Sequence, residues 1–248
     1  MAMRLDDGVH LVMSGGGGFD LTDAFDCNVF AIDAGGEWVL FDAGAGRDMA
    51  AVEAVLAGDG IAPATISHVF LTHGHADHSG GAAALRELTH AIVHAGPLTA
   101  PMVAKGDEAA INLGRAKKAG IYPAAYRYRA CAIDDVVEEG KPLAIRDLAV
   151  TMIATPGHSA DHVSYVVERA GRRFLIAGDA LFYGGKVAIQ DIGDCNIGDV
   201  CATVRKLAAV DFDALLPGHL NFTLKNAHRH AEAALAHVER FACPPSII

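Results

Sequence analysis

The stretch that decides the fold reads Ile66-Ser-His-Val-Phe-Leu-Thr-His73-Gly-His75-Ala-Asp77-His78-Ser-Gly80. Its apolar first half is typical of a buried strand, and its Gly and Ser residues predict a loop where that strand ends. Alternate residues of an extended chain point the same way, so we expect His73 and His75 to bind one metal ion. Asp77 and His78 follow a turn of the backbone, and we expect them to face a second ion beside the first.

The density of donors in this stretch favours metal binding over two simpler interpretations. Those interpretations are a solvated loop and core histidines satisfied by hydrogen bonds, either of which would be preferred for a lone histidine. Here three histidines and one aspartate occur within six residues, in a chain with 13 histidines among 248 residues. Imidazole and carboxylate groups together are ligands typical of zinc.

Composition limits the function classes. With 248 residues, 52% of them hydrophobic, the chain is long enough for a large core in one or two domains. A net charge of −10 argues against a nucleic-acid partner, because nucleic acids usually bind to a basic protein surface.

No apolar run has the length of a membrane span, and the first residues lack a signal-peptide pattern, so we expect a cytoplasmic protein. The five cysteines have no close pairs and are expected to be free thiols.

Strand and helix patterns alternate along the chain, which predicts layered α/β packing. Five times a hydrophobic strand pattern is followed by a tight turn and then by His or Asp. The histidines of the last predicted helix, His228, His230 and His237, are interpreted as exposed. The predicted strands are Val9–Met13, Cys27–Asp33, Glu37–Phe41, Val69–Leu71, Ala91–His94, Leu148–Ala154, Val163–Val167, Arg173–Ala177 and Phe212–Leu216, and the predicted helices are Arg47–Ala57, Gly81–Leu88, Asp199–Ala208 and His228–Arg240.

Residues 97–130 differ from the rest of the chain. Glycines and prolines interrupt short helical pieces, six Lys and Arg residues concentrate positive charge, and three of the five tyrosines (Tyr122, Tyr126 and Tyr128) occur here. We predict an inserted helical cap. It either walls the substrate site and attracts an anionic group, or presents a solvated helical face; the sequence leaves both interpretations open.

Four motifs follow one another in a familiar order: HGHADH at 73–78, TPGH at 155–158, GDA at 178–180 and PGH at 217–219. Together they resemble the metallo-β-lactamase superfamily. The resemblance implies a single domain over residues 1–248 with a four-layer αβ/βα sandwich and a metal site at one edge. It also implies the ligands: His73, His75 and His158 for one ion, Asp77, His78 and His219 for the other, and Asp179 bridging both.

This ligand set is similar to that of glyoxalase II type thioesterases and acyl-homoserine lactonases. The resemblance implies two divalent ions, zinc first, with iron or manganese also fitting, and a bridging hydroxide that attacks an ester-like bond of a small molecule. Asp77 is a candidate for protonating the leaving group. Only 29 residues follow His219, so we expect no glutathione-binding helical domain. Tyr183 lies four residues past Asp179 and is a candidate partner of a substrate oxygen, or else a packing residue.

Several roles stay open at the level of sequence. Asp42 either orders the histidine loop from behind or caps the next helix, and His162 either supports the metal site or is an ordinary buried histidine. Residues 191–196 are expected to line the pocket, with Cys195 structural. A sulfur dioxygenase of the same superfamily, with one iron, is the alternative function, and a ribonuclease is disfavoured by the acidic charge. We expect a small-molecule substrate, no nucleic acid or membrane partner, and allow for a homodimer.

Overall fold

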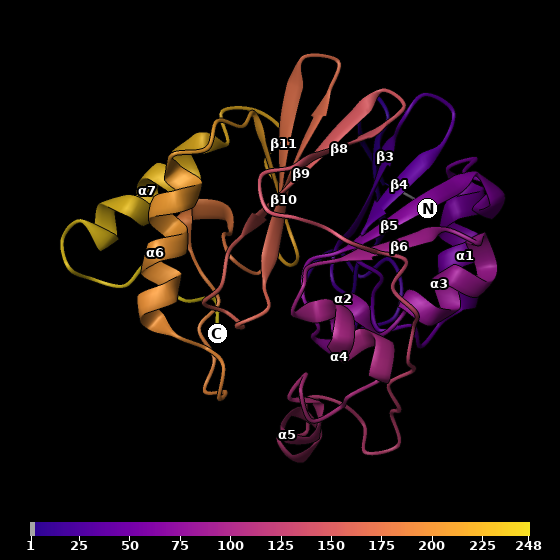
Figure 1. Ribbon diagram of the computed structural model, residues 1–248, viewed down its shortest axis with the longest axis horizontal. Helices are drawn as coiled ribbons and strands as arrows, with labels where there is room; N and C mark the ends of the chain where they lie inside the picture. Colours follow the sequence, from indigo (N-terminus) through magenta and orange to yellow (C-terminus); the bar gives the residue numbers. More distant parts are fainter. Residues whose placement is uncertain (1–2) are drawn as a thin grey trace. The chain divides into compact units, whose positions relative to one another are not determined.

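The computed structural model describes residues 3–248. These residues divide into two compact units, of which the first ends at Val137 and the second spans Glu138–Ile248. Each unit holds one mixed β-sheet and its own helices, which are labelled in Figure 1. The α/β class expected from the alternation of strands and helices is therefore confirmed.

The sheet of the first unit runs in the order β1 to β7 within residues 3–137. The strands from β1 to β4 pair antiparallel, and the pairs from β4–β5 onward are parallel. Parallel neighbours need a crossover, which α1 supplies between β4 and β5 and α3 between β5 and β6. The bounds are β1 (Met3–Asp6), β2 (Val9–Met13), β3 (Val29–Asp33), β4 (Trp38–Phe41), α1 (Met49–Gly58), β5 (Ile66–Leu71), α3 (Ala82–Thr89), β6 (Ile92–Ala95) and β7 (Asp135–Val136).

Helix α1 packs on this sheet through apolar residues spaced three and four positions apart. Val52, Val55 and Leu56 of the helix are buried in one cluster with Leu40 and Val69 of the sheet. Each fully buried aliphatic side chain contributes about 1.5–3 kcal/mol relative to leaving it in water. A short 3-10 helix, Pro63–Thr65, then leads the chain into β5.

The donor loop, residues 72–81, begins where β5 ends and contains the one-turn helix α2 (Ala76–Ser79). The turn that follows β4 packs directly against this loop, and the amide of Ala43 donates to the carbonyl of His78 at 2.7 Å. A Cβ added at Gly81 would overlap the Ala43 carbonyl oxygen. Glycine at position 81 therefore lets two backbone segments approach each other and hold the loop in place.

The second unit has the sheet order β12-β11-β10-β9-β8 within residues 138–248. Its strands are β8 (Pro142–Ile145), β9 (Leu148–Ala154), β10 (Val163–Arg169), β11 (Arg172–Gly178) and β12 (Ala214–Pro217), with a 3-10 turn at Tyr183–Gly185. The pairs from β8 to β11 are antiparallel, and β11 pairs with β12 in parallel. Helix α6 (Ile197–Ala208) makes the crossover that this parallel pair requires.

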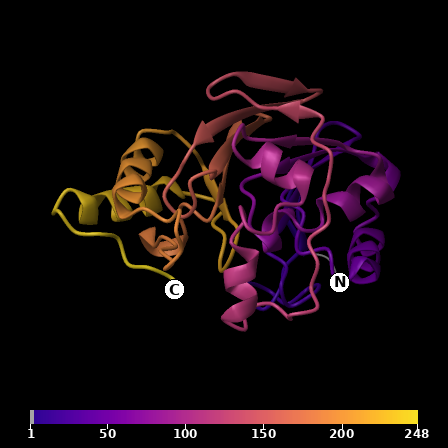
Figure 2. The ribbon, with the colours of Figure 1, turned by 60° about the horizontal axis from the view of Figure 1, so that its bottom comes forward.

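Helices α6 and α7 (His228–Val238) lie side by side, orange and yellow in Figure 2. Val204 and Leu207 of α6 and Ala231 and Ala234 of α7 are buried in one cluster with Leu215 of the sheet. The apolar stripes of both helices therefore close the core of this unit.

The strand and helix predictions are confirmed, with ends displaced by a few residues. The prediction that His230 is exposed is wrong: its side chain is buried. Its Nδ1 accepts a hydrogen bond from the Gly184 amide at 3.0 Å, and its Nε2 lies 3.0 Å from Thr223 Oγ1. Burial lowers the pKa of this imidazole. Of its two neighbours, His237 is exposed and His228 is half-buried.

Residues 97–130 lie in the first unit and contain the short helices α4 (Thr99–Lys105) and α5 (Leu113–Lys118). Short helical pieces were predicted here, whereas the assignment of a cap inserted into a single domain over 1–248 stays a prediction. Between residues 3 and 248, none of the helices combines the length and apolar character needed to cross a membrane.

The close packing at the donor loop gives a stability prediction. Gly81→Ala should lower the free energy of unfolding by about 1–3 kcal/mol, because the new methyl group must displace backbone. The matched control is Gly114→Ala in α5, where a Cβ meets nothing within 4 Å. That change should be neutral or stabilise by up to about 1 kcal/mol. Urea unfolding midpoints of both variants check this, and equal midpoints would contradict it.

Candidate metal centre

A buried carboxylate organises the first group of donors. Strands β4 and β5 are parallel neighbours with Phe41 opposite Phe70, so the residues that follow them, Asp42 and Thr72, lie side by side. The Thr72 amide donates to Asp42 Oδ1 at 2.7 Å, and its hydroxyl lies 2.9 Å from Oδ2. Asp42 Oδ2 is also 2.8 Å from Nδ1 of His78.

These contacts decide between the two interpretations of Asp42. It orders the donor loop from behind, whereas α1 is capped by Asp48, whose carboxylate accepts from the Ala51 amide at 3.0 Å. The proton positions follow from the hydrogen bonds. A carboxylate only accepts, so Nδ1 of His78 donates to Asp42 and Nε2 keeps its lone pair.

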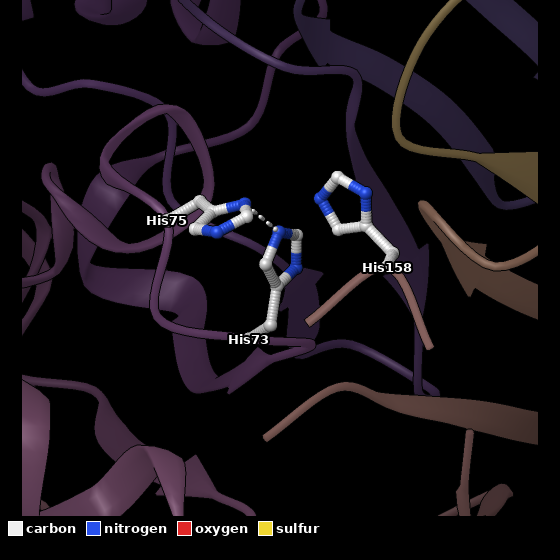
Figure 3. A group of neighbouring side chains, drawn as sticks. All are labelled: His73, His75 and His158. Atoms are coloured by element: carbon white, nitrogen blue, oxygen red, sulfur yellow. Dashed lines mark hydrogen bonds between the residues drawn. The ribbon is translucent and has the colours of Figure 1, made fainter. Parts of the chain in front are cut away.

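The same reasoning applies to the next histidine of the loop. The Thr72 hydroxyl has one proton, which it donates to the Asp42 carboxylate, so it accepts from Nδ1 of His73 at 3.0 Å. Nε2 of His73 is then free of its proton and lies 3.1 Å from Nδ1 of His75 (Figure 3). The Nε2 lone pair of His73 is therefore directed toward His75; that these two histidines bind one ion stays a prediction.

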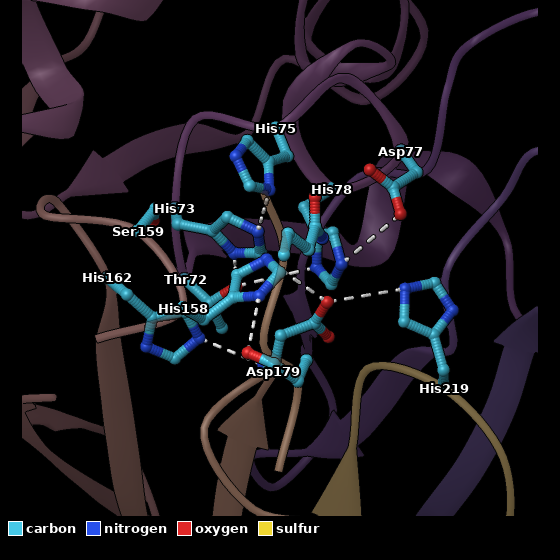
Figure 4. Close-up of polar contacts among 12 residues, drawn as sticks. Thr72, His73, His75, Asp77, His78, His158, Ser159, His162, Asp179 and His219 are labelled. Atoms are coloured by element: carbon cyan, nitrogen blue, oxygen red, sulfur yellow. Dashed lines mark hydrogen bonds and ion pairs between the residues drawn. The ribbon is translucent and has the colours of Figure 1, made fainter. Parts of the chain in front are cut away.

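The distances in the first unit fit ligands of a metal ion. Two atoms bound to a tetrahedral zinc at about 2.0–2.1 Å lie about 3.3–3.4 Å apart. The pair His73 and His75 is close to this value, and Nε2 of His78 lies 3.5 Å from Oδ2 of Asp77 (Figure 4). The latter separation is too long for a good hydrogen bond but suits two donors that share an ion.

The second unit gathers its own three donors at one edge of its sheet. Strands β9, β11 and β12 all end at this edge, because β9 and β11 each run antiparallel to β10 and β12 runs parallel to β11. His158, Asp179 and His219 follow these three ends. Asp179 Oδ2 lies 3.4 Å from Nε2 of His158 and 3.6 Å from Nε2 of His219 (Figure 4). Both distances again suit donors that share an ion.

His162 is a support of this second group. The Asp179 amide donates to Nε2 of His162 at 2.9 Å, so the proton of this imidazole is on Nδ1, which lies 2.9 Å from Thr155 Oγ1. The imidazole therefore joins the start of β10 to the backbone of Asp179. Of the two interpretations of His162 from the sequence, this contact favours the support of the donors.

Three tyrosines of residues 97–130 contact the donor loop and the turn beside it, which the sequence interpretation missed. Tyr122 is buried in one cluster with Ala76 of the donor loop, and its pKa is raised well above the usual value, first by burial and then by the Asp77 charge. The Tyr128 hydroxyl lies 2.7 Å from Ser79 Oγ, and the Tyr126 hydroxyl donates to the Ala45 carbonyl at 2.8 Å. The concentration of tyrosine was the available signal, but their partners lie far away in the sequence.

Cys27 is a further neighbour that sequence reasoning missed. Its sulfur lies within 4.8 Å of donor atoms of Asp42 and His78. Burial raises the pKa of this thiol to about 12, so it is neutral at physiological pH. Nδ1 of His78 is already bonded to Asp42. The neutral Cys27 thiol is therefore not a partner of that nitrogen and packs behind the donors.

The remaining candidates lie in the second unit. The Tyr183 ring is partly exposed and packs on His230 with ring centroids 4.5 Å apart. In the segment 191–196, Cys195 Sγ accepts from the Gln190 amide at 3.4 Å, and Asn196 accepts from the Asp199 amide at 3.1 Å, which caps α6. These contacts are structural. A role of Tyr183 toward substrate stays a prediction.

The chain resembles known proteins over most of its length. It is 30% identical over 185 residues to an uncharacterized protein of Aquifex aeolicus (strain VF5), covering 74% of this chain and 78% of that one. It is 26% identical over 162 residues to the hydroxyacylglutathione hydrolase of Marinomonas sp. (strain MWYL1), covering 65% of this chain. The match spans 50% of that hydrolase, about half of its length.

Among solved structures, BJP-1, a subclass B3 metallo-β-lactamase of Bradyrhizobium japonicum, superposes with a TM-score of 0.72 at 22% identity. The superposition covers 97% of this chain and 91% of that one, and it confirms the fold class expected from the motifs. Residues 22–219 match the family model of the metallo-β-lactamase superfamily. The chain therefore belongs to the metallo-β-lactamase superfamily.

Proposed function

We propose that this protein is a dinuclear metal-dependent hydrolase that cleaves an ester-like bond, a thioester or a lactone, of a small molecule. The observation that carries the proposal is the tautomer pattern of the donor loop. Asp42 and Thr72 occupy the Nδ1 atoms of His78 and His73, which leaves both Nε2 lone pairs for metal. The proposed ligands are His73, His75 and His158 for one ion and Asp77, His78 and His219 for the other, with Asp179 shared.

Zinc is the metal we propose, because the donors are imidazole nitrogens and carboxylate oxygens in tight groups. Iron and manganese accept the same donors. When bound, two such ions polarise a carbonyl group and provide a nucleophile from water near neutral pH.

The chain's own residues hold the donors and move protons. Asp42 fixes the tautomer and the ring orientation of His78, and His162 fixes the backbone of Asp179. The Asp77 side chain is partly exposed, at 21%, so it can also exchange a proton with the leaving group. Metal ligation and proton transfer are therefore both available to Asp77.

The ester-like substrate is supported by family membership and by the Marinomonas relative, whose name describes an acyl-glutathione substrate. An acyl-glutathione is a thioester, and a lactone presents a similar carbonyl. Attack on either carbonyl develops negative charge on oxygen, which a cationic centre stabilises. We propose a small-molecule substrate from this chemistry.

Metal content is the first test of the proposal. Protein purified without added metal should contain about two divalent ions per chain, mainly zinc, by elemental analysis. Removal of these ions with a chelator should abolish thioester or lactone hydrolysis, and zinc should restore it. One iron per chain with little zinc would contradict the proposal and favour the dioxygenase. Oxygen uptake with a persulfide would then be measured.

A ligand substitution tests the same centre at one residue. His75→Ala should lower hydrolysis by more than about 100-fold, because one ion loses a direct ligand. The matched control is His237→Ala, an exposed histidine of α7, which should keep wild-type turnover. Circular dichroism should be unchanged in both variants. Wild-type turnover of His75→Ala would exclude the proposed ligand set.

A further inference from the structure

The hydroxyl of Ser79 closes the donor loop on itself. Ser79 Oγ donates to the Gly74 carbonyl at 2.8 Å and lies 3.0 Å from the His75 carbonyl. The Ser79 amide also donates to the His75 carbonyl, at 2.9 Å. These bonds hold residues 74–79 in a compact turn that contains three of the proposed ligands, and Ser79 itself is fully buried. The position of the Ser79 hydroxyl therefore bears on the position of the ligands.

The phenol of Tyr128 sets the direction of that hydroxyl. Tyr128 Oη lies 2.7 Å from Ser79 Oγ, whereas the other acceptor within its reach, the Ser79 carbonyl, is 3.4 Å away. A serine hydroxyl has one proton, and that of Ser79 is directed to a backbone carbonyl, so the phenol donates and Ser79 Oγ accepts. Both residues are buried, and a buried hydroxyl that loses one partner has no water to replace it.

The segment 97–130 fixes Tyr128 through its backbone and its ring. The Tyr128 amide donates to Glu108 Oε1 at 3.0 Å, and Oε2 of the same carboxylate lies 2.7 Å from Nζ of Lys117 in α5. The hydrogen bond from Lys117, followed by that from the Tyr128 amide, lowers the pKa of Glu108, so this acceptor is charged at neutral pH. The Tyr128 ring is buried in one cluster with Ala76 of the donor loop. The phenol is therefore held at a set place beside the loop.

We propose that Tyr128 is a positioning residue, which donates a hydrogen bond to Ser79 and so holds the backbone of the donor loop in the shape that binds metal. The inference rests on the proposed dinuclear function and deepens it. The ion bound by the histidines on either side of Gly74 is the one affected first, because the Gly74 carbonyl accepts from Ser79. The segment 97–130 thereby gains a role that neither of its sequence interpretations contained.

The chain offers a closely matched pair of variants. Tyr128→Phe and Tyr126→Phe each remove one hydroxyl and keep a ring of the same hydrophobic cluster. The Tyr126 hydroxyl donates to the backbone carbonyl of Ala45 at 2.8 Å, which belongs to the turn after β4 and not to the donor loop. A difference between the two variants therefore separates positioning of the loop from packing. Ser79→Ala removes the hydroxyl through which Tyr128 acts and tests the same bond from its other side.

The measurement is zinc binding to metal-free full-length protein, titrated against a chromophoric chelator of known affinity, after circular dichroism has shown each variant to be folded. Tyr128→Phe should weaken one of the two binding steps by roughly 10-fold and leave the other within about threefold. Tyr126→Phe should leave both steps as in the wild type. Ser79→Ala should weaken the same step at least as much, and Tyr128→Phe added to Ser79→Ala should cost no more than about twofold further, because the two groups act as one unit.

Three outcomes would overturn the inference. Wild-type zinc binding by Tyr128→Phe or by Ser79→Ala excludes positioning through this hydrogen bond, and an equal loss in Tyr126→Phe shows that packing alone is responsible. A Tyr128→Phe loss that persists in full in the Ser79→Ala background places the effect elsewhere, because the inference requires that it acts through Ser79. If instead the wild-type protein binds fewer than two ions, the proposed function itself fails, which distinguishes the two failures.

Discussion

The donor loop depends on one buried carboxylate. Asp42 follows β4 and accepts hydrogen bonds from the Thr72 amide, the Thr72 hydroxyl and Nδ1 of His78. Burying a charge away from water costs free energy unless the charge is fully hydrogen-bonded. The buried Asp42 carboxylate therefore keeps these hydrogen-bond donors in place. The parallel pairing of β4 with β5 makes the arrangement possible, because it sets Asp42 beside Thr72 before any side chain contributes.

Much of the donor arrangement could be predicted from the sequence, because its chemistry is local. Four donors lie within residues 73–78, and each of the other three follows a recognisable strand and turn. The role of Asp42 could not be decided in this way. An aspartate after a strand is equally suited to cap a helix, and only the non-local pairing of two strands distinguishes these roles. The contact of Tyr128 with Ser79 escaped prediction for the same reason, since nothing near Tyr128 in the sequence indicates Ser79.

His230 shows a different limit of sequence interpretation. Histidines on a terminal helix are usually solvated, which favoured an exposed position. The helix nevertheless carries buried Ala234 and Val238 four and eight residues further on, the spacing of one helical face. This periodicity placed His230 on the buried stripe, and the polar atoms of its ring are satisfied there by the Gly184 amide and Thr223. Periodicity was therefore more informative than residue type.

The aromatic residues also divide the molecule into regions that can be observed separately. Trp38 is the only tryptophan of the chain; it begins β4 and makes a T-shaped contact with the His10 ring, with ring centroids 5.0 Å apart. Tyr122, Tyr126 and Tyr128 belong to the segment 97–130, away from that strand in the sequence. Indole fluorescence therefore reports on the start of β4, the central strand of the first sheet, whereas three of the five phenol groups lie in the segment beside the donor loop. Tryptophan fluorescence and tyrosine absorbance can therefore follow the unfolding of these two regions separately.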